Sequence, residues 1–232
     1  MDLKEGGFLL IDKPYTWTSF QVVNKLKSII RKATGEKKFK IGHAGTLDPL
    51  ATGLLIVCFG KYTKKIEEFQ GKDKQYTGTF HLGATTLSFD KEHPENETFP
   101  IEHINEDIIK TTAKQFIGEQ EQVPPAYSAV KINGKRAYHY VKAGMEVEMK
   151  IRQITISQFD ITNINMPNVD FLISCSKGTY IRSIARDFGF AMNSGAYLSA
   201  LRRTRIGNFS IDEAKSIEEI EKEILENNLI TI

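Results

Sequence analysis

The sequence has few of the residues that mark secreted, metal-clustered or membrane-embedded proteins. Its 232 residues include two cysteines and one tryptophan. No apolar run approaches the roughly 18 residues that a membrane span requires. Cys58 and Cys175 lie in apolar, strand-like stretches, which is typical of small buried side chains rather than of a disulfide or a zinc site. Residues 1–7 lack the basic and then apolar order of a signal peptide. We therefore expect a cytoplasmic globular protein.

A large excess of charge of one sign is also missing. The 31 Lys and Arg residues nearly balance 29 Asp and Glu residues, for a net charge of +2. The distribution is uneven, because residues 210–232 carry seven acids against two lysines, whereas residues 13–40 carry eight bases against Glu36 alone. A basic body with an acidic tail suits a polyanionic partner, although charge runs are more often solvated faces.

One segment concentrates the residues that could carry chemistry. From Gly42 to Leu55 the chain reads Gly-His-Ala-Gly-Thr-Leu-Asp-Pro-Leu-Ala-Thr-Gly-Leu-Leu, with a single acid, Asp48, just before Pro49. Glycine permits close backbone approach and proline fixes the turn, so a stiff loop would hold the acid at the rim of the apolar run that follows. This placement suits a catalytic carboxylate, but Asp before Pro also commonly starts a turn.

Residue patterning predicts mixed strands and helices. N-caps at Thr18 and Asn105 predict helices, as does the apolar spacing from near Thr179, and residues 88–100 are polar and loop-like. Strands or extended segments are expected over residues 7–11, 54–59, 76–83, 145–164 and 169–176, and an acidic amphipathic helix over about 212–227. Since strands and helices do not alternate strictly, an α+β fold is favoured. No repeat or linker divides the chain, so we expect one catalytic domain over residues 1–232.

The segment around Asp48 resembles the catalytic-aspartate motif of the bacterial tRNA pseudouridine-55 synthases over fourteen consecutive positions. The resemblance implies that Asp48 is the nucleophile that converts uridine to pseudouridine in the T-loop of tRNA. His43 would lie against the flipped-out nucleotides. It also implies the pseudouridine synthase fold, a mixed and mostly antiparallel sheet flanked by helices, with an RNA-binding thumb insertion at about 122–150. We expect no cofactor, no metal, no obligatory protein partner and a monomer.

Further matching segments extend the resemblance over nearly the whole chain. Lys13 lies in Leu10–Pro14, where a strand exit explains it, and the family implies a structural or RNA-contacting role. Thr16 stands where family members usually have glycine. Tyr76 is implied to stack on the target base and to take part in proton transfer at C5, although a strand tyrosine is more often in the core. Lys131, in the thumb, is placed to meet phosphates.

The last matching segments surround Arg182. An arginine in the first turn of a helix lies unfavourably near the positive end of the dipole, which makes sense if it reaches a carboxylate. In the family the matching arginine pairs with the catalytic aspartate, and an adjacent cation keeps a carboxylate ionised. The resemblance places further residues at the base or the RNA: Tyr180, Leu201, Arg202 and Arg203.

Alternatives remain at this stage. A tRNA-binding chaperone would use the same surface without catalysis, and Asp48→Asn would separate the two activities. His43 and Asp48 could instead be metal ligands of a hydrolase, but no further His or acid lies at convincing ligand spacing. Asp48 could attack ribose C1′, attack uracil C6 or first abstract a ribose proton.

The region after the catalytic segments also bears on substrate choice. Many family members continue into a small C-terminal RNA-binding domain, for which the acidic helix near the end of this sequence leaves no room. We therefore expect RNA recognition by the catalytic domain alone. A T-arm stem-loop should then be nearly as good a substrate as full tRNA, with an affinity that falls with salt.

Overall fold

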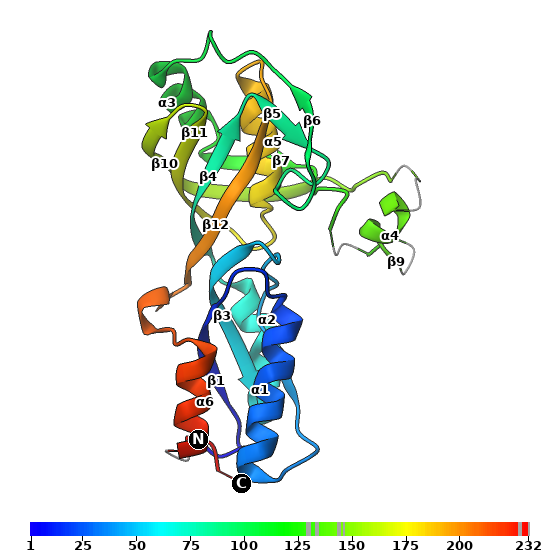
Figure 1. Ribbon diagram of the computed structural model, residues 1–232, viewed down its shortest axis with the longest axis vertical. Helices are drawn as coiled ribbons and strands as arrows, with labels where there is room; N and C mark the ends of the chain where they lie inside the picture. Colours follow the sequence, from blue (N-terminus) through cyan, green and yellow to red (C-terminus); the bar gives the residue numbers. More distant parts are fainter. Residues whose placement is uncertain (129–130, 133–134, 143–144, 146, 227–228, 232) are drawn as a thin grey trace. The chain divides into compact units, whose positions relative to one another are not determined.

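The computed structural model describes residues 1–128, 131–132, 135–142, 145, 147–226 and 229–231 (Figure 1). Contacts divide the chain into two compact units. Unit 1 comprises Met1–Tyr76 and Arg202–Ile232, and unit 2 comprises Thr77–Leu201. The prediction of a single catalytic domain stays a prediction. Among the described residues, no helix is long and apolar enough to cross a membrane.

Unit 1 is built around the buried strand β3 (Ala51–Phe59). Strand β1 (Gly7–Lys13) pairs with it antiparallel over its whole length, and β2 (Ile41–His43) pairs with its last residues. Residues Arg202–Ile206 of β12 (Ala196–Ile206) follow β3 in the strand order and pair with β13 (Phe209–Ser210). The short helices of this unit are η1 (Gly60–Lys65), α2 (Ile66–Gly71) and η2 (Ile211–Glu213).

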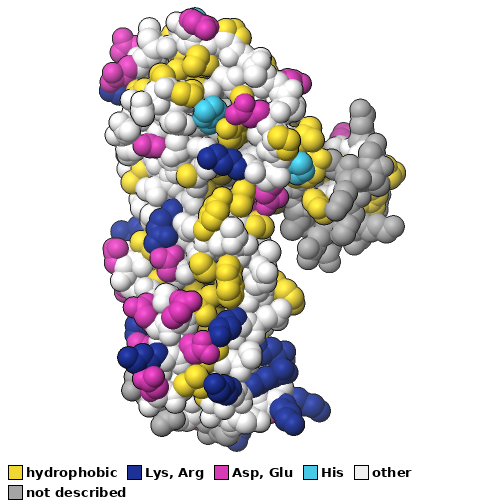
Figure 2. All heavy atoms as spheres, viewed as in Figure 1, with side chains coloured by type: hydrophobic (Ala, Val, Ile, Leu, Met, Phe, Trp, Pro, Cys, Tyr) yellow, Lys and Arg dark blue, Asp and Glu magenta, His cyan; other side chains and the backbone are white. Residues whose placement is uncertain are grey.

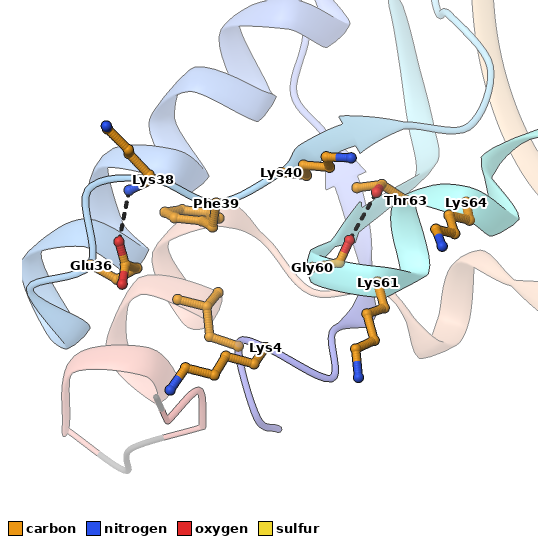
Figure 3. A pocket seen from close by; sticks show the side chains of 10 residues that line it. Lys4, Glu36, Lys38, Phe39, Lys40, Gly60, Lys61, Thr63 and Lys64 are labelled. Carbon is orange, nitrogen blue, oxygen red and sulfur yellow. Dashed lines mark hydrogen bonds between the residues drawn. The ribbon is translucent and has the colours of Figure 1, made fainter.

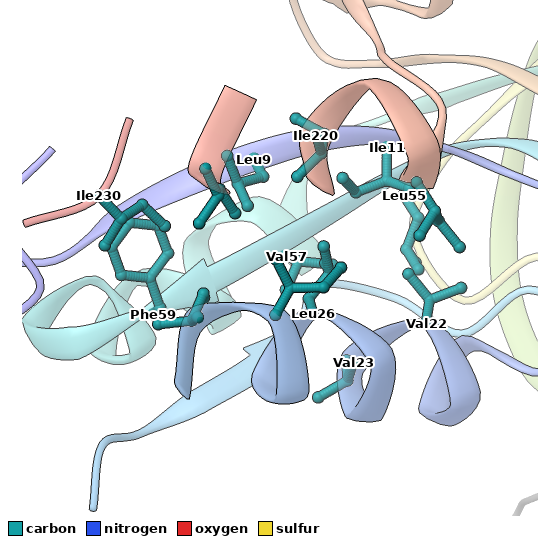
Figure 4. Packing of buried hydrophobic residues seen from close by; sticks show 14 of the residues in the cluster. Leu9, Ile11, Val22, Val23, Leu26, Leu55, Val57, Phe59, Ile220 and Ile230 are labelled. Atoms are coloured by element: carbon teal, nitrogen blue, oxygen red, sulfur yellow. The ribbon is translucent and has the colours of Figure 1, made fainter. Parts of the chain in front are cut away.

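Helix α1 (Ser19–Thr34) covers the core of unit 1 together with α6 (Ile217–Glu226). The N-cap predicted at Thr18 is confirmed, because its side chain accepts the Gln21 N–H in a capping box. Gly35 ends the helix in the left-handed conformation, at φ 72°. The apolar face of α1 packs with β1, β3 and α6 in one cluster, which includes Leu9, Ile11, Val22, Leu26, Val57 and Ile220 (Figure 4).

In unit 2 the strands of the main sheet follow the order β4, β11, β10 and β7. These strands are β4 (Lys74–Leu82), which begins in unit 1, β11 (Asn168–Cys175), β10 (Arg152–Asn165) and β7 (Gly118–Gln122). The other elements are β5 (Ala84–Thr86), β6 (Glu95–Thr98), α3 (Glu106–Gln115), β8 (Lys131–Ile132), β9 (Lys135–Arg136), α4 (Ala137–Lys142) and α5 (Ile181–Ala191). Aromatic rings fill the core, with Phe80 and Phe171 stacked at 4.2 Å and Phe159 and Phe188 packed nearby.

Most predicted elements are confirmed, including the helix that Asn105 caps and the acidic α6. The predicted loop over 88–100 is wrong at Glu95–Thr98, which forms the exposed strand β6 paired with β5. Strand β7 was not predicted. Its Gly-Glu-Gln-Glu-Gln sequence has low strand propensity, and pairing with β10 supplies the ladder bonds instead.

Candidate active site

Asp48 lies half-buried in the loop of residues 44–50, which joins β2 to β3 in unit 1. The Ala51 N–H donates to the Asp48 carbonyl at 3.1 Å, so the turn through Pro49 closes directly before β3. At the other end of the loop, the Ala44 N–H donates to the Ile56 carbonyl at 2.8 Å. The backbone is therefore fastened at both ends of the loop.

Two buried side chains hold the middle of this loop by its backbone. Ser19, which is 2% exposed, accepts the Leu47 N–H at 2.9 Å, and its hydroxyl donates to the Leu47 carbonyl at 3.2 Å. The fully buried Lys13 donates from Nζ to the Pro49 carbonyl at 3.3 Å and to two carbonyls of the β1–α1 connection. These bonds fix the residues immediately before and after Asp48.

The protonation of Lys13 reflects this position. Burial lowers the pKa of its ammonium group to about 8, while the Asp48 carboxylate acts in the opposite direction and the Arg203 guanidinium lowers the pKa further. An ammonium group so close to the loop supports it through charge and hydrogen bonds together. Lys13 thus supports the loop, and an RNA contact by Lys13 stays a prediction.

Arg203 is also buried, at 1% exposure, and its guanidinium binds backbone. Its Nε donates to the Leu54 carbonyl at 2.8 Å and its Nη2 to the Gly45 carbonyl at 3.1 Å. Gly53, at φ +102°, lets the strands meet, since an added Cβ would lie 2.3 Å from the Arg203 carbonyl. An interior guanidinium supports the loop and does not meet an RNA phosphate. This placement corrects the RNA contact predicted for Arg203.

Arg202 has a different partner. Its two terminal nitrogens bind the two carboxylate oxygens of Asp12 at 3.0 and 2.6 Å, in a bidentate pair. The side chain is 41% exposed, so an RNA contact by Arg202 stays a prediction.

His43 ends β2, and its surroundings favour the neutral form of its ring. Burial, and then the charge of Arg203, lower the pKa of the imidazole, which favours the neutral ring at neutral pH. Its Nδ1 is buried and has no hydrogen-bond partner among the described residues. A ring nitrogen of this kind is a candidate contact for a nucleotide.

Arg182, in unit 2, is held by contacts within that unit. Its side chain is 5% exposed in the first turn of α5, and Nη1 donates to the Ser88 carbonyl at 3.1 Å and to the Tyr127 carbonyl at 3.0 Å. Its Nε lies 3.5 Å from Oδ2 of Asp90. The unfavourable position of Arg182 in the helix is therefore matched by a carboxylate. Asp48 belongs to the other unit, and its pairing with Arg182 stays a prediction.

Asp90 was not predicted as a site residue. It is 4% exposed, and its Oδ1 accepts the Ser88 hydroxyl at 2.5 Å and the Glu92 N–H at 3.0 Å. Phe89 between them has φ 56°, a strained conformation for a bulky residue. This turn directs both the Ser88 carbonyl and the Asp90 carboxylate toward Arg182. The only signal in the sequence was the place of Asp90 in the polar segment 88–100.

Tyr180, the N-cap residue of α5, is held by a buried amide. Gln122, which is 2% exposed, accepts the Tyr180 N–H at 2.8 Å and donates to the Tyr180 carbonyl at 3.1 Å. The ring of Tyr180 is half-buried, with the Arg152 guanidinium 5.6 Å from its centroid. Gln122 therefore fixes the backbone that carries the predicted base contact. The sequence analysis had included position 122 only as the start of the predicted thumb insertion.

Three predicted site residues remain: Tyr76, Leu201 and Lys131. Tyr76 lies in the part of β4 that belongs to unit 1 and is 8% exposed, and Leu201 is half-buried in β12. Lys131 lies in β8, and its side chain is outside the described residues. Within the described part of the chain, no three His, Cys, Asp or Glu residues are grouped to hold a metal ion.

Comparison with known proteins decides the family. The N-terminal domain of TruB family pseudouridylate synthase matches residues 31–181, and the C-terminal domain of tRNA pseudouridylate synthase B matches residues 182–230. The chain belongs to the TruB family. It is 57% identical to a tRNA pseudouridine synthase B of Flavobacterium johnsoniae over 95% of this chain and 96% of that protein. It is 50% identical to one of Phocaeicola vulgatus, over 94% and 93% of the two chains.

Solved structures agree with the sequence matches. A chain from the crystal structure of a Cbf5-Nop10-Gar1 complex matches with a TM-score of 0.74 and 28% identity. The match covers 98% of this chain and 57% of that chain, so this chain spans little more than half of the solved one. The predicted α+β pseudouridine synthase fold is confirmed.

Proposed function

We propose that this protein isomerises uridine to pseudouridine at position 55 in the T-loop of tRNA, with Asp48 as the nucleophile. One observation carries the assignment of Asp48: the backbone on both sides of this acid is clamped by buried groups, Ser19 and Lys13, while its own side chain stays partly accessible. A structural aspartate in a turn needs no such support. A nucleophile does, because misplacement by about 1 Å is costly to a reaction that depends on alignment.

The reaction rearranges bonds within one nucleotide. The target uridine is first extruded from the folded loop, since its reactive face is inaccessible in the stack. The N1–C1′ bond breaks, the uracil turns and the C5–C1′ bond forms. The proton lost from C5 is balanced by a proton gained at N1, so no external group is consumed. A carboxylate nucleophile divides this exchange into easier steps. His43, as a neutral ring, and Tyr76 and Tyr180, as aromatic surfaces, bind the extruded nucleotide.

Arg182 positions the carboxylate and keeps it ionised in this proposal. Asp90 and the two backbone carbonyls hold the guanidinium in one orientation, so that little reorganisation is needed when charge develops. The enzyme acts in the cytoplasm as a monomer, with no obligatory protein partner. The exposed lysines of both units supply phosphate contacts.

The test incubates an unmodified tRNA transcript with wild type and with Asp48→Asn, and maps pseudouridine by carbodiimide labelling and primer extension. We expect one stop, at the T-loop uridine, with wild type only. Asp48→Asn should still bind tRNA, because the substitution removes the charge but keeps the shape of the side chain.

Two other outcomes separate the alternatives. Salt-sensitive tRNA binding by wild type without any stop would favour a chaperone that folds the T-arm. Loss of the stop in a strong chelator would favour a metal-dependent enzyme. Activity that persists in the chelator supports the proposal.

A further inference from the structure

A cavity of about 410 Å³ lies in unit 1, at the end of β3 farthest from Asp48 (Figure 3). Eight residue steps separate Ala51 from Phe59, so at about 3.3 Å per residue the cavity is roughly 25 Å from the catalytic loop. It is therefore distinct from the site described above. We call it the lysine pocket, after five of its lining residues: Lys4, Lys38, Lys40, Lys61 and Lys64.

The backbone that carries these lysines is tightly fixed. The Gly60 N–H donates to the Lys40 carbonyl at 2.9 Å, which joins η1 to the segment that enters β2. Gly60 itself approaches the N-terminal turn so closely that an added Cβ would lie 2.4 Å from the Leu3 carbonyl. The N-terminal turn, the segment before β2 and the start of η1 are thus joined by close backbone contacts. Figure 3 shows Lys38 and Lys40 on either side of the partly buried Phe39, with Lys61 and Lys64 beside Gly60 and Thr63.

The positive charge of the lysine pocket is only partly neutralised. Hydrogen bonds from two backbone N–H groups lower the pKa of the Asp2 carboxyl group, and the nearby charges of Lys4 and Lys61 lower it further. Glu36 is the one acid in its lining, and it accepts the backbone N–H of Lys38. Lys61 pairs with Glu5 at 2.6 Å, and both side chains are exposed. Among the described residues, the other four lysines of the pocket form no ion pair. Further Lys and Arg side chains gather on the side of unit 1 that α1 forms (Figure 2). Such a field attracts a polyanion.

The chemistry of the pocket fits an RNA backbone. Lysine ammonium groups are point charges that neutralise phosphates without requiring a particular base. The partly buried ring of Phe39 provides an apolar surface against which a ribose or an unstacked base can lie. A concave surface of this size admits a nucleotide unit rather than a whole helix face.

We propose that the lysine pocket binds backbone phosphates of the tRNA outside the modified T-loop. This inference rests on the proposed function only in taking tRNA as the RNA that the pocket binds. It departs from the expectation that a T-arm stem-loop is nearly as good a substrate as full tRNA, because the pocket adds contacts that the stem-loop lacks. The geometry assigns these contacts to binding and not to the chemical step.

The experiment compares Lys40→Ala/Lys64→Ala with the matched control Lys110→Ala/Lys114→Ala, which removes two exposed lysines from α3. Filter binding at several salt concentrations gives Kd for a full tRNA transcript and for its T-arm stem-loop. The pocket variant should weaken binding of full tRNA about tenfold and reduce the slope of log Kd against log salt by about two. Its Kd for the stem-loop should change less than about twofold, as should both values for the control.

The possible results are distinguishable. An equal loss on both RNAs, or a pocket variant that behaves like the control, overturns the proposal. The proposal is also overturned if inorganic phosphate, but not tRNA, protects Lys40 and Lys64 from an amine-modifying reagent. The pocket would then be a small-anion site. Pseudouridine formation is measured in the same samples at saturating tRNA, where the pocket variant should match wild type. If wild type forms none, the proposed function fails, while the Kd comparison still decides the pocket.

Discussion

The two units hold their charged site residues in opposite ways. In unit 1, Lys13, Ser19 and Arg203 bind the backbone of the Asp48 loop, and Asp48 itself is half-buried. In unit 2, Asp90 and two carbonyls bind the side chain of Arg182 itself, which is 5% exposed. The difference fits the proposed function. A nucleophile must reach the substrate, so its alignment depends on a fixed backbone, whereas a cation that positions another group can be immobilised by its own donors.

Among substitutions in unit 2, Arg182→Lys should have the largest effect on the reaction rate. A lysine cannot reach Asp90 and two carbonyls at once, so the rate at saturating enzyme should fall about 10²–10³-fold. Single-turnover formation of pseudouridine measures this rate. Arg186→Lys, one turn further along α5 and paired with Asp187, is the control and should lose less than about threefold. Similar losses in both variants would show that the arrangement around Arg182 has no special role.

Asp90→Asn tests the carboxylate that holds Arg182 rather than the Arg182 guanidinium itself. The amide keeps the shape of the side chain but leaves the buried guanidinium of Arg182 without its carboxylate. The free energy of unfolding should therefore fall by about 3 kcal/mol. The single-turnover rate should fall at least about tenfold. Urea titration and single-turnover assays measure the two quantities. Asp187→Asn, in a partly exposed pair, should cost less than about 1 kcal/mol. Equal costs for the two substitutions would contradict the account of unit 2.

Ser19→Ala tests the clamp of unit 1. The substitution removes both hydrogen bonds to Leu47, so we expect a loss of about 1–2 kcal/mol in unfolding free energy and about tenfold in kcat. KM should change less, because the loop aligns the nucleophile and does not bind the tRNA stem. The exposed Ser28→Ala on the same helix is the control. A rise in KM with kcat unchanged would indicate that the loop contributes only to binding.

The smallest effect on catalysis is expected from the titration of Lys13. Its pKa is about 8 in the folded protein against an ordinary 10.5, so between these values the unfolded chain binds more protons and the unfolding free energy rises with pH. Relative to Lys13→Met, wild type should gain about 1.5 kcal/mol between about pH 8 and pH 9.5. Urea titrations of both proteins across this range measure the gain. A constant difference between them would mean that Lys13 does not titrate there.

Sequence reasoning succeeded where the determinants are local. The cap at Thr18 is made by Gln21, three residues away, and the turn at Asp48 by the proline that follows it. Thr16, which stands where the family usually has glycine, has φ 69°, so the family preference has a backbone cause that could be anticipated.

The missed residues depend on contacts between distant parts of the sequence. Asp90 acquires its role from Arg182, 92 positions later in the chain, and from the strained turn at Phe89. Gln122 likewise meets Tyr180 across 58 positions. No local pattern distinguishes such residues from ordinary polar loop residues. The same reason explains Arg203, which was predicted to face RNA but is buried by its contacts with Gly45 and Leu54.

The central claim is that Asp48 performs the chemistry and that the surrounding groups only position it. The most direct test follows the C5 proton, because it leaves only when the C5–C1′ bond has formed. Wild type and Asp48→Asn are each held in excess over tRNA labelled with tritium at uracil C5, at matched occupancy. We predict release of tritium from the target uridine by wild type, and none above the enzyme-free background by Asp48→Asn. Release by Asp48→Asn at a rate close to wild type would contradict the account.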